Sequence, residues 1–454
     1  MSTKEVADHG TKANVIVAVQ ASILLCFAIG SIMSWNVVII TISDLHLALG
    51  SRSNTTQVKE DTTYFQSAGL KVFYDPVQQG ILYAAPLVSG LIFAYPIQRC
   101  LCQYHARFVY SIITAVSIVS TAVHPLMLPE NFYLVVLVRL VQGVVFALVF
   151  PTIAYFITYW STLAENTVFM SIFMGVAQLS GLLSIPLSSY FVKHYGWPLA
   201  FYAHAGITGL FWLIWTFNYR ENTVFSRANL ARTKLSFSTM AYHLRQTNTW
   251  AVLFATAANC TLVVFVVQFL QLFLMSAHGV RMQNAGVIVG GLIASQFFVK
   301  VISGFLVQKM TFMPLSWRIR FFNSIAFFAP AALLVWDATG LKSDQAKLLS
   351  ILLVFVVGGF NAGGFLKSPA FIQQGAWIVG AVHAVNALVS ITFSMVVPIL
   401  APNGSFHEFH FCFVIVATAL TVGNILFCLL SRAGEPNHTA SMLTISTIAP
   451  FGDF

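Results

Sequence analysis

VIVAVQASILLCFAIGSIMSWNVVIITI, residues Val15–Ile42, is a continuous apolar run without one charged side chain. A hydrocarbon layer of about 30 Å needs roughly 20 apolar residues in a helix. Runs of this length recur from Asn14 almost to Ser431, and they do not alternate in polarity as the strands of a membrane β-barrel do. Because lipid cannot hydrogen-bond to backbone groups, these runs predict transmembrane α-helices.

The overall composition agrees with a chain that lies mostly in lipid. Of its 454 residues, 58% are hydrophobic and 8% are charged, whereas roughly a quarter of a soluble domain is charged. The net charge of +9 would suggest a nucleic-acid partner in a soluble protein, but in a membrane protein the position of each cation matters more than the sum. The six cysteines lie in or beside apolar runs, so no disulfide framework is expected.

The apolar runs and the breakers between them predict an all-α membrane protein with twelve transmembrane helices in two six-helix halves. We expect the first six spans at residues 15–42, 77–97, 108–128, 133–158, 167–190 and 198–219, and the second six at 249–275, 284–309, 320–340, 347–367, 377–400 and 410–431. The polar stretch 220–248 separates an N-terminal bundle, 15–219, from a C-terminal bundle, 249–431. Residues 1–14 and 432–454 form the tails.

The distribution of Lys and Arg predicts the orientation. If both termini are cytoplasmic, the cytoplasmic loops and tails hold most of the cations, namely Lys4, Lys12, Arg99, Arg107, Arg227, Arg232, Lys234, Arg245, Lys309, Arg318, Arg320, Lys367 and Arg432. This asymmetry follows the positive-inside rule, so we expect cytoplasmic N- and C-termini and a cytoplasmic central loop. It also explains the basic net charge without a ligand patch.

Three glycosylation sequons test that orientation weakly. Asn54, in the polar loop 43–76, and Asn403 fall on the outer or luminal side, where glycosylation takes place. The third, at Asn437, falls on the cytoplasmic tail and should be unused. We therefore expect a glycoprotein modified at Asn54 and Asn403.

Corresponding spans of the two halves share a faint repeat. Ser89-Gly90-Leu91 late in span 2 recurs as Ser303-Gly304-Phe305 late in span 8, 214 residues later. Pro186 late in span 5 recurs as Pro398 late in span 11, 212 residues later. Near-equal offsets are typical of a parallel six-plus-six duplication, with the substrate path between the halves.

Spans 4 to 6 carry the densest set of motifs. They are RLVQG at Arg139–Gly143, Pro151, Trp160 with Glu165, Gly175-Val176-Ala177-Gln178, Pro186, Tyr195-Gly196-Trp197-Pro198, Phe201-Tyr202, and Trp212 with Trp215. Asp75-Pro76 with Gly80, the run Gly358–Phe365 and Pro398 add to them. With this spacing the chain resembles the anion:cation symporter branch of the major facilitator superfamily, which includes sialin, the vesicular glutamate transporters and the sodium-phosphate cotransporter-like proteins. The resemblance implies the major facilitator fold and secondary transport of an anion.

This chain departs from that family at its usual coupling positions. Ser34 stands where members often have an Arg in span 1, and Tyr83 where the vesicular glutamate carriers have a His. Phe146 replaces a Glu linked to proton coupling, and Leu366–Phe371 replaces a polar Asn/His/Asp stretch. The resemblance therefore makes Ser34 and Tyr83 candidate substrate contacts, but it does not supply a driving ion.

Two cations lie far from the ends of the predicted spans, where a charge costs about 2.5–3.5 kcal/mol on insertion scales. Arg139 lies roughly 9 Å from the outer end of span 4, and its fork of donors suits a carboxylate or phosphate. Lys300 lies roughly 13 Å from the inner end of span 8, farther than its stem comfortably reaches. We expect both to bind substrate. The alternatives are that Arg139 snorkels outward or braces its neighbours, and that Lys300 hydrogen-bonds to another helix.

Uncharged polar residues and glycines complete the candidates. Asn361 in span 10 has an amide able to bind a ligand or to bond across helices. His383 in span 11 is the candidate for proton coupling, although a hydrogen-bonded packing role is the simpler interpretation. Hinge or close-packing positions are Gly358, Gly359, Gly363 and Gly364.

The sequence shows no enzyme signature. It has no Walker-type Gly-Lys-Ser/Thr loop, and Cys100 and Cys102 lack the neighbours of a zinc site. We expect no metal, no cofactor, no nucleic-acid partner and no catalytic activity. The leading hypothesis is a monomeric secondary transporter of a small organic or inorganic anion, with H⁺, Na⁺ or neither as the coupling ion. The alternative is a non-transporting sensor or scaffold derived from a transporter. The tails do not separate a plasma membrane from a lysosomal or vesicular one.

Overall fold

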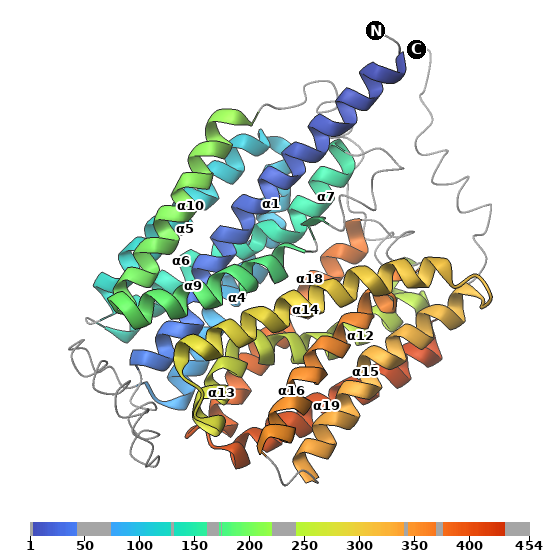
Figure 1. Cartoon of the computed structure of the whole chain (residues 1–454). Coiled ribbons are helices and arrows are strands. Elements are labelled where there is room, and N and C mark those ends of the chain that lie inside the picture. Colours follow the sequence, from blue (N-terminus) through green and yellow to red (C-terminus); the bar gives the residue numbers. More distant parts are fainter. Residues whose placement is uncertain are drawn as a thin grey trace.

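The fold of the chain is a pair of helical bundles, shown by a computed structural model in Figure 1. The structure describes residues 3–42, 74–128, 131–160, 172–173, 175–219, 242–339, 344–368 and 376–431. Within these ranges the regular structure is entirely helical, as the apolar runs predict.

The first bundle, called the N-half, ends at Tyr219. Its helices are α1 (Thr3–Ile42), α4 (Pro76–Gln103), α5 (Ala106–Met127), α6 (Phe132–Gly143), η1 (Val144–Leu148), α7 (Val149–Tyr159), α9 (Val176–Tyr195) and α10 (Trp197–Asn218). The segments α6, η1 and α7 form one span that is broken by a 3₁₀ turn. Because α1 begins at Thr3, residues 3–14, expected as a tail, extend the first helix.

The second bundle, called the C-half, repeats this plan. Its helices are α12 (Thr247–Val264), η2 (Phe265–Phe269), α13 (Leu270–His278), α14 (Met282–Lys309), α15 (Leu315–Thr339), α16 (Asp344–Gly358), η3 (Gly359–Ala362), η4 (Phe365–Lys367), α18 (Ala376–Leu400) and α19 (Phe406–Leu430). The segments α12, η2 and α13 form one long span with a π-helical turn, and α16 to η4 form another with 3₁₀ turns.

Eleven helices of the described chain are long and apolar enough to cross a membrane. The remaining one, α9, is more polar and buries Ser180, Ser184, Ser188 and Ser189. It packs on α1 and α10 and also on α14 of the C-half, so little of it has to face lipid. The prediction of twelve transmembrane helices in two halves is therefore confirmed.

The end of α9 lies beyond the prediction, which placed span 5 at 167–190. The helix continues to Tyr195 and stops at Gly196, whose φ of 90° is in the left-handed region. Glycine adopts this conformation without the cost that a β-carbon imposes. Trp197 and Pro198 then begin α10, where proline is tolerated in the first turn.

The two halves pack their helices in the same pairs. In the N-half α1 packs on α9 and α10, and α5 packs on α10. In the C-half the corresponding α12 packs on α18 and α19, and α15 packs on α19. This agreement is the structural counterpart of the sequence repeat.

The repeated Ser-Gly motif marks a close helix crossing in each half. Ser89 and Gly90 lie against Gly143 and Phe146, where α4 crosses η1. In the C-half, Ser303 Oγ donates a hydrogen bond of 3.4 Å to the carbonyl of Gly359, where α14 crosses η3. Small residues allow the backbones to approach at both crossings.

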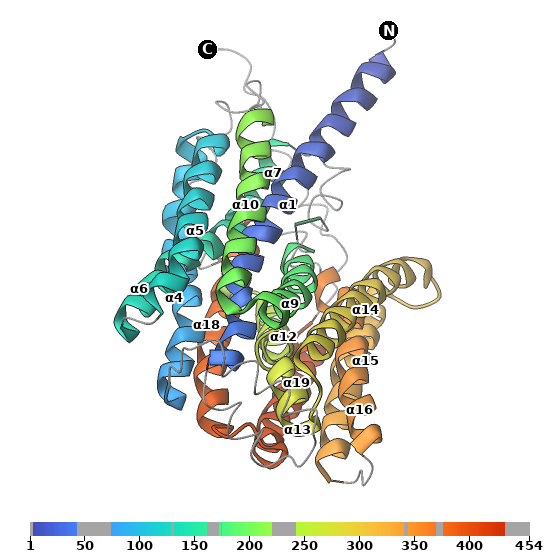
Figure 2. The same ribbon diagram turned by 60° about the vertical axis from the view of Figure 1, so that its left-hand side comes forward.

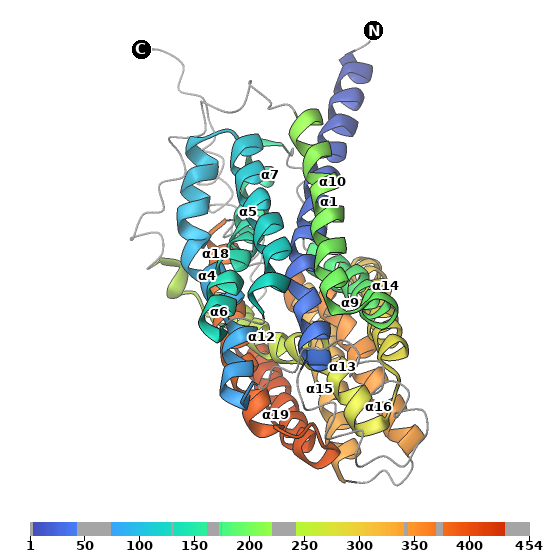
Figure 3. The same cartoon turned by 90° about the vertical axis from the view of Figure 1, so that its left-hand side faces the viewer.

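The halves meet at one end and diverge at the other. One end of each half is where α4 leads into α5 and α14 leads into α15, near Arg99, Arg107, Lys309 and Arg318, and we call it the basic end. The opposite end, where α1 ends and α4 begins, is the loop end. In Figure 1 the basic end of the N-half points up and that of the C-half points to the right, while the loop ends lie in the lower part. Figure 2 and Figure 3 show α14 beside α9 and α18 beside α4.

Candidate functional site

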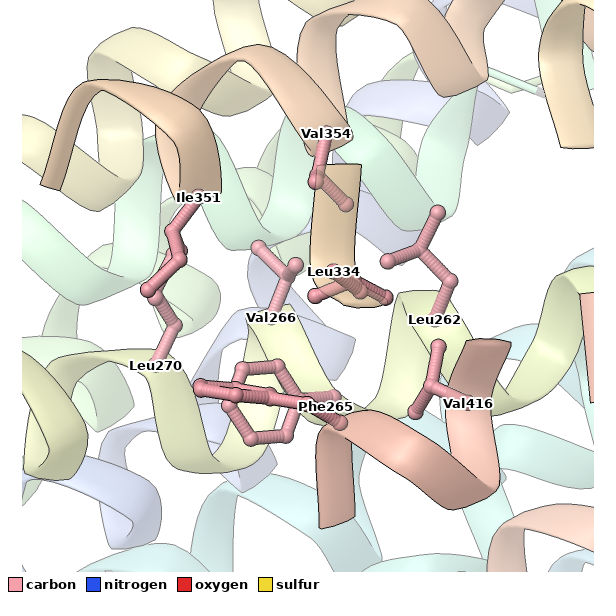
Figure 4. Close-up of a pocket in the computed structure, with 9 residues that line it drawn as sticks. Leu262, Phe265, Val266, Leu270, Leu334, Ile351, Val354 and Val416 are labelled. Atoms are coloured by element: carbon pink, nitrogen blue, oxygen red, sulfur yellow. The ribbon is translucent and has the colours of Figure 1, made fainter. Parts of the chain in front are cut away.

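An apolar pocket inside the C-half is too small and too dry to be the site. It has a volume of about 10 Å³, which is about that of one water-sized probe. Figure 4 shows its wall of aliphatic and phenylalanine side chains, which includes Leu262, Phe265 and Val416. The wall has no charged or polar side chain, so the site has to be sought where the halves meet.

The first seam between the halves runs along α9 and α14. It begins at the loop end, where Lys193 Nζ donates a 2.7 Å hydrogen bond to Gln283 Oε1. Further along, Gly290 lies against the ring of Pro186. The seam ends at mid-depth, where Gln178 Nε2 donates to Gln296 Oε1 at 2.8 Å.

The second seam runs along α4 and α18. At the loop end Gly80 packs against the backbone of Met395. At mid-depth the Nε2 atom of His383 lies 3.4 Å from the carbonyl oxygen of Gly90, and its ring centroid lies 4.6 Å from that of Phe150. This contact is the counterpart of the Gln178–Gln296 pair on the other side of the molecule.

Both seams are closed from the loop end to mid-depth. On this side of the two pairs, further hydrogen bonds and ring contacts join the halves, namely Asn36–Val267, Gln271–Ser189 and Tyr83–Phe269. Beyond them α14 continues to Lys309 and α4 to Gln103, while the halves diverge.

Arg139 lies inside the N-half, on α6, and is 1% exposed. Its Nε donates a 3.2 Å hydrogen bond to the carbonyl of Leu82 on α4. Its Nη1 donates to the carbonyl of Ile32 on α1 at 3.1 Å and to Gln142 Oε1 at 2.8 Å. Arg139 thus braces α1, α4 and α6 in this conformation, which was the structural alternative to substrate binding.

The surroundings of Arg139 hold aromatic rings and no acid. Its guanidinium carbon lies 5.3 Å from the centroid of the Trp35 ring, close enough for a cation–π contact. No described residue accepts a hydrogen bond from its Nη2. Because no carboxylate is buried among the described residues of the N-half, the charge of Arg139 has no counterion there.

Tyr83 and Ser34 differ in their relation to the gap between the halves. The ring of Tyr83 packs on Phe269 of the C-half with centroids 5.0 Å apart, so it forms part of the closed loop-end side. Ser34 is fully buried, and its Oγ donates to the carbonyl of Ser31 in its own helix at 2.8 Å. Its neighbour Asn36 reaches the C-half instead, where its Nδ2 donates to the carbonyl of Val267 at 3.1 Å.

Lys300 continues the face of α14 that lines the first seam. Ile293 on this face packs against α9 at Gly181, and Lys300 lies seven residues, or about two turns, nearer the basic end. Its side chain is partly exposed, and no described residue forms a hydrogen bond or an ion pair with its ammonium group. The structure thus places Lys300 just beyond the last contact of the seam.

Asn361 lies in η3, at a depth where the C-half has a small group of amides. Its Nδ2 donates to Asn259 Oδ1 on α12 at 2.7 Å, and its own Oδ1 is buried without a partner. Asn259 is partly exposed. Asn259 is therefore a polar contact of Asn361 on α12, a helix that the sequence analysis did not single out.

The four glycines near Asn361 lie at tight contacts. A β-carbon on Gly359 would lie 2.8 Å from the carbonyl oxygen of Gln296. One on Gly363 would lie 2.9 Å from the ring of Phe322, one on Gly364 2.8 Å from Asn323 Oδ1, and one on Gly358 3.1 Å from Leu262. Close packing accounts for these glycines, and the 3₁₀ turns show that the helix is also broken there.

The two glycosylation candidates lie outside this region. Asn54 is outside the described residues. Asn403 is exposed at the loop end, and its Nδ2 donates to Glu408 Oε1 at 2.7 Å beside the capping box that begins α19. No cluster of His, Cys, Asp or Glu in the described part of the chain would hold a metal ion.

Sequence reasoning missed Gln296, Asn259 and Asn36 as polar contacts of the central region. Each lies in an apolar span and carries no charge, so the cost that marks a buried cation does not mark a buried amide. Only Gln296 among them has a partner, Gln178, that lies in one of the sequence motifs.

Comparisons with known proteins agree with this architecture. The Major Facilitator Superfamily model matches residues 23–402. The chain belongs to the major facilitator superfamily. It is therefore a multi-pass membrane transporter by family rather than an enzyme.

The similar proteins of known sequence include two sialins. Sialin of Homo sapiens is 22% identical over 323 residues, covering 66% of this chain and 65% of the human protein. Sialin of Ovis aries is 22% identical over 423 residues, covering 86% of this chain and 85% of the sheep protein. Both matches agree with the anion:cation symporter branch of the superfamily.

Solved major facilitator structures share the fold. A bacterial homolog of the human lysosomal transporter Spinster, in an inward-facing and unoccupied conformation, aligns with a TM-score of 0.64 at 13% identity, covering 92% of this chain and 97% of that one. The nucleoside transporter NupG, as a mutant, aligns with a TM-score of 0.60 at 15% identity, covering 92% of this chain and 100% of that one.

Proposed function

We propose that this major facilitator is a secondary active transporter of a small organic or inorganic anion that works by alternating access. The observation that carries the proposal is the pair of cations far from the ends of the described spans, Arg139 and Lys300. Both acidic side chains of the described spans, Asp337 and Glu408, lie at the loop-end ends of their helices. A negatively charged solute is the chemistry that would compensate this positive charge.

The proposed orientation places both termini and the basic end in the cytoplasm, in keeping with the positive-inside rule. With that orientation the closed loop end faces outward or into a lumen, and the diverging basic end faces the cytoplasm. The described conformation then corresponds to an inward-facing state. Lys300 would meet the anion first, and Arg139, with its free Nη2 donors, would hold it deeper in the N-half.

The two cations have unequal support. Lys300 is partly exposed, and no described residue forms a hydrogen bond or an ion pair with its ammonium group. Arg139 is sealed by Ile32, Leu82 and Gln142, so it contacts an anion only if the bundle rearranges. Asn259 and Asn361, which lie on the C-half side, would add hydrogen bonds that select among anions.

An uptake screen in liposomes tests the proposal. Purified protein is reconstituted and offered radiolabelled inorganic phosphate, urate, L-glutamate and N-acetylneuraminate, with imposed pH or sodium gradients or a membrane potential. We expect at least one anion to accumulate, because a tenfold gradient stores about 1.4 kcal/mol for the carrier to use. Arg139→Ala should abolish that uptake. A flat response to every anion in folded protein would contradict transport and favour a sensor or scaffold.

A further inference from the structure

A polar stripe runs along the buried face of α5. It consists of Tyr110, Thr114, Ser117, Thr121 and His124, each 0% or 1% exposed. Their spacings of four, three, four and three residues place them on one side of the helix. The stripe begins near the basic end, where α5 starts, and ends at His124 toward the loop end. An apolar helix that only filled a core would need no such row.

Several atoms of this stripe lack a hydrogen-bond partner. They are Thr114 Oγ1, Ser117 Oγ and both ring nitrogens of His124. A buried Ser or Thr in a helix ordinarily bonds to the carbonyl four residues before it, as Ser180 does at 2.9 Å on α9. Leaving a buried polar group unpaired costs about 1–3 kcal/mol. Small polar side chains with unpaired atoms are the sites that internal water occupies.

His124 also lies next to Arg139. Its ring stacks on Phe201 at 4.7 Å and lies 5.0 Å from the Trp35 ring, the same ring that Arg139 covers. A second link is a chain of hydrogen bonds. Arg139 Nη1 donates to Gln142 Oε1 at 2.8 Å, and Gln142 Nε2 donates to Thr121 Oγ1 at 2.9 Å, one turn before His124.

The charges around His124 are few. Of the described elements packed on α5, α1 contributes Cys26, α4 Tyr83, α6 Arg139 and α10 His204 as buried titratable side chains, and η1 contributes none. Arg139 is the one that is charged at neutral pH, and no carboxylate is buried among the described residues of the N-half. A proton on His124 would therefore add a second positive charge, and an anion beside Arg139 would offset it.

We propose that His124 is a proton-binding site, which water reaches from the basic end along the α5 stripe. We further propose that a proton on His124 and an anion at Arg139 stabilise each other's binding. This second step rests on the proposed function, whereas the proton site does not. A ring nitrogen accepts one proton from water and returns it to water, so no other bond forms or breaks. By linkage, the anion must increase proton binding as much as the proton increases anion binding.

Solid-state NMR of protein labelled with ¹⁵N-histidine in lipid bilayers tests the site without any substrate. The ring signal that His124→Gln removes identifies His124. We expect magnetisation from mobile water to reach this buried ring, and we expect its nitrogens to gain imidazolium character as the pH is lowered from about 8 to about 4. The comparison is His204, which is equally buried but bonded to Ser188 Oγ at 2.9 Å. A dry ring that stays neutral throughout this range would overturn the proposal.

Thr114→Val tests the water path, since it removes one hydroxyl at nearly constant volume and leaves His124 in place. We expect slower transfer from water to the His124 ring, and unchanged transfer would contradict the path. If His124→Gln does not fold, sequential backbone correlations assign the His124 ring signal instead, so that Thr114→Val still tests the path.

Uptake in liposomes tests the coupling. With radiolabelled N-acetylneuraminate, L-glutamate, urate and inorganic phosphate as probes, His124→Gln should lose the stimulation by an imposed pH gradient but keep anion exchange. His204→Gln should keep both. Equal stimulation of His124→Gln and wild type would overturn the coupling. If wild type takes up none of these anions, the proposed function fails, while the NMR result still decides the proton site.

Discussion

The N-half and the C-half each hold one cation inside the membrane, but in opposite ways. Arg139 in the N-half is 1% exposed and donates hydrogen bonds to three residues on three helices. Lys300 in the C-half is partly exposed and bonds to no described residue through its ammonium group. The same kind of charge is thus hydrogen-bonded within the bundle in one half and without a described partner in the other.

This difference distinguishes a buried charge that the protein itself stabilises from one that it does not, and the sequence alone cannot tell these two cases apart. A charge in lipid is expensive wherever it lies, so Arg139 and Lys300 are equally conspicuous in the sequence. Hydrogen bonds offset that cost for Arg139 within the protein. For Lys300 no described residue supplies such hydrogen bonds, which is why we propose that an anion contacts Lys300 first.

Gly143→Ala should have the largest effect, because it attacks the helix crossing on which the N-half depends. The added β-carbon would overlap Cα and the carbonyl oxygen of Pro86, which are backbone atoms that cannot rotate away. Overpacking of this kind costs about 1–3 kcal/mol or more. We expect little folded protein in a size-exclusion profile.

The matched controls for that change are Gly359→Ala and Gly206→Ala. Gly359 is the counterpart in the C-half, with 2.8 Å to Gln296 O, so a smaller loss is expected. Gly206 has no atom within 4 Å of the added carbon and should tolerate it. Equal tolerance at all three positions would show that the N-half crossing is looser than described.

Arg139→Gln should come second and should lower the stability of the fold. The change removes hydrogen bonds from a charged donor to the carbonyls of Leu82 and Ile32, each worth about 1.5–3 kcal/mol. Lys300→Gln breaks no such bond and should leave stability almost unchanged. Thermal unfolding of both variants in detergent checks the contrast. Similar melting temperatures for the two variants would show that Arg139 does not stabilise the bundle more than Lys300 does.

Gln178→Ala and Gln296→Ala should have a smaller effect, because they weaken the contact between the two halves and not the packing within either half. Their 2.8 Å hydrogen bond is the last contact of the α9–α14 seam. Removing it should weaken the closed loop-end side by about 0.5–1.5 kcal/mol. Because Gln296 Nε2 also donates to the carbonyl of Phe355 at 3.2 Å, the double variant should cost no more than Gln296→Ala alone. The measurement is a double-mutant cycle on thermal unfolding. Additive losses would mean that the two amides do not act as a pair.

His243 should show the smallest effect, since it lies outside the spans at the entrance to the C-half. Its ring centroid lies 5.5 Å from that of Trp377, and burial lowers the pKa of its imidazole below the ordinary value. The unfolded chain then binds the proton more readily, so this contribution to stability is complete above the ordinary pKa and is lost as the pH falls below it. Melting temperatures at about pH 7.5 and pH 5 should differ less in His243→Gln than in wild type. An equal difference in melting temperature in the variant and in wild type would show that His243 does not contribute to the pH dependence of stability.

Much of the architecture can be predicted from this sequence, because the length of an apolar run sets the length of a membrane helix. The weakest prediction concerned span 5. The serines of α9 lower its hydrophobicity, and they are tolerated because α1, α10 and α14 surround it. Run length measures contact with lipid, so it describes a helix at the centre of the molecule least well.

The candidate site could be predicted only in part. Arg139 and Lys300 stand out because a charge is rare in a span, but the partners of Arg139 are backbone carbonyls on other helices, which no sequence pattern reveals. Tyr83 and Ser34 came from family positions, and the structure places only Tyr83 at the boundary between the halves. The α5 stripe is visible in the sequence at helical spacing, but the lack of partners for its atoms is not.

The most direct test of the central claim is the concentration dependence of uptake for Lys300→Gln in liposomes, with Lys309→Gln at the end of the same helix as the control. The probe is whichever of the four screened anions wild type accumulates most. Loss of a charge-assisted contact of about 1.5–3 kcal/mol predicts a rise in KM of roughly 10- to 100-fold for Lys300→Gln, with the melting temperature unchanged. Lys309→Gln should behave as wild type. An unchanged KM for Lys300→Gln would contradict the claim that Lys300 is the cation that receives the anion.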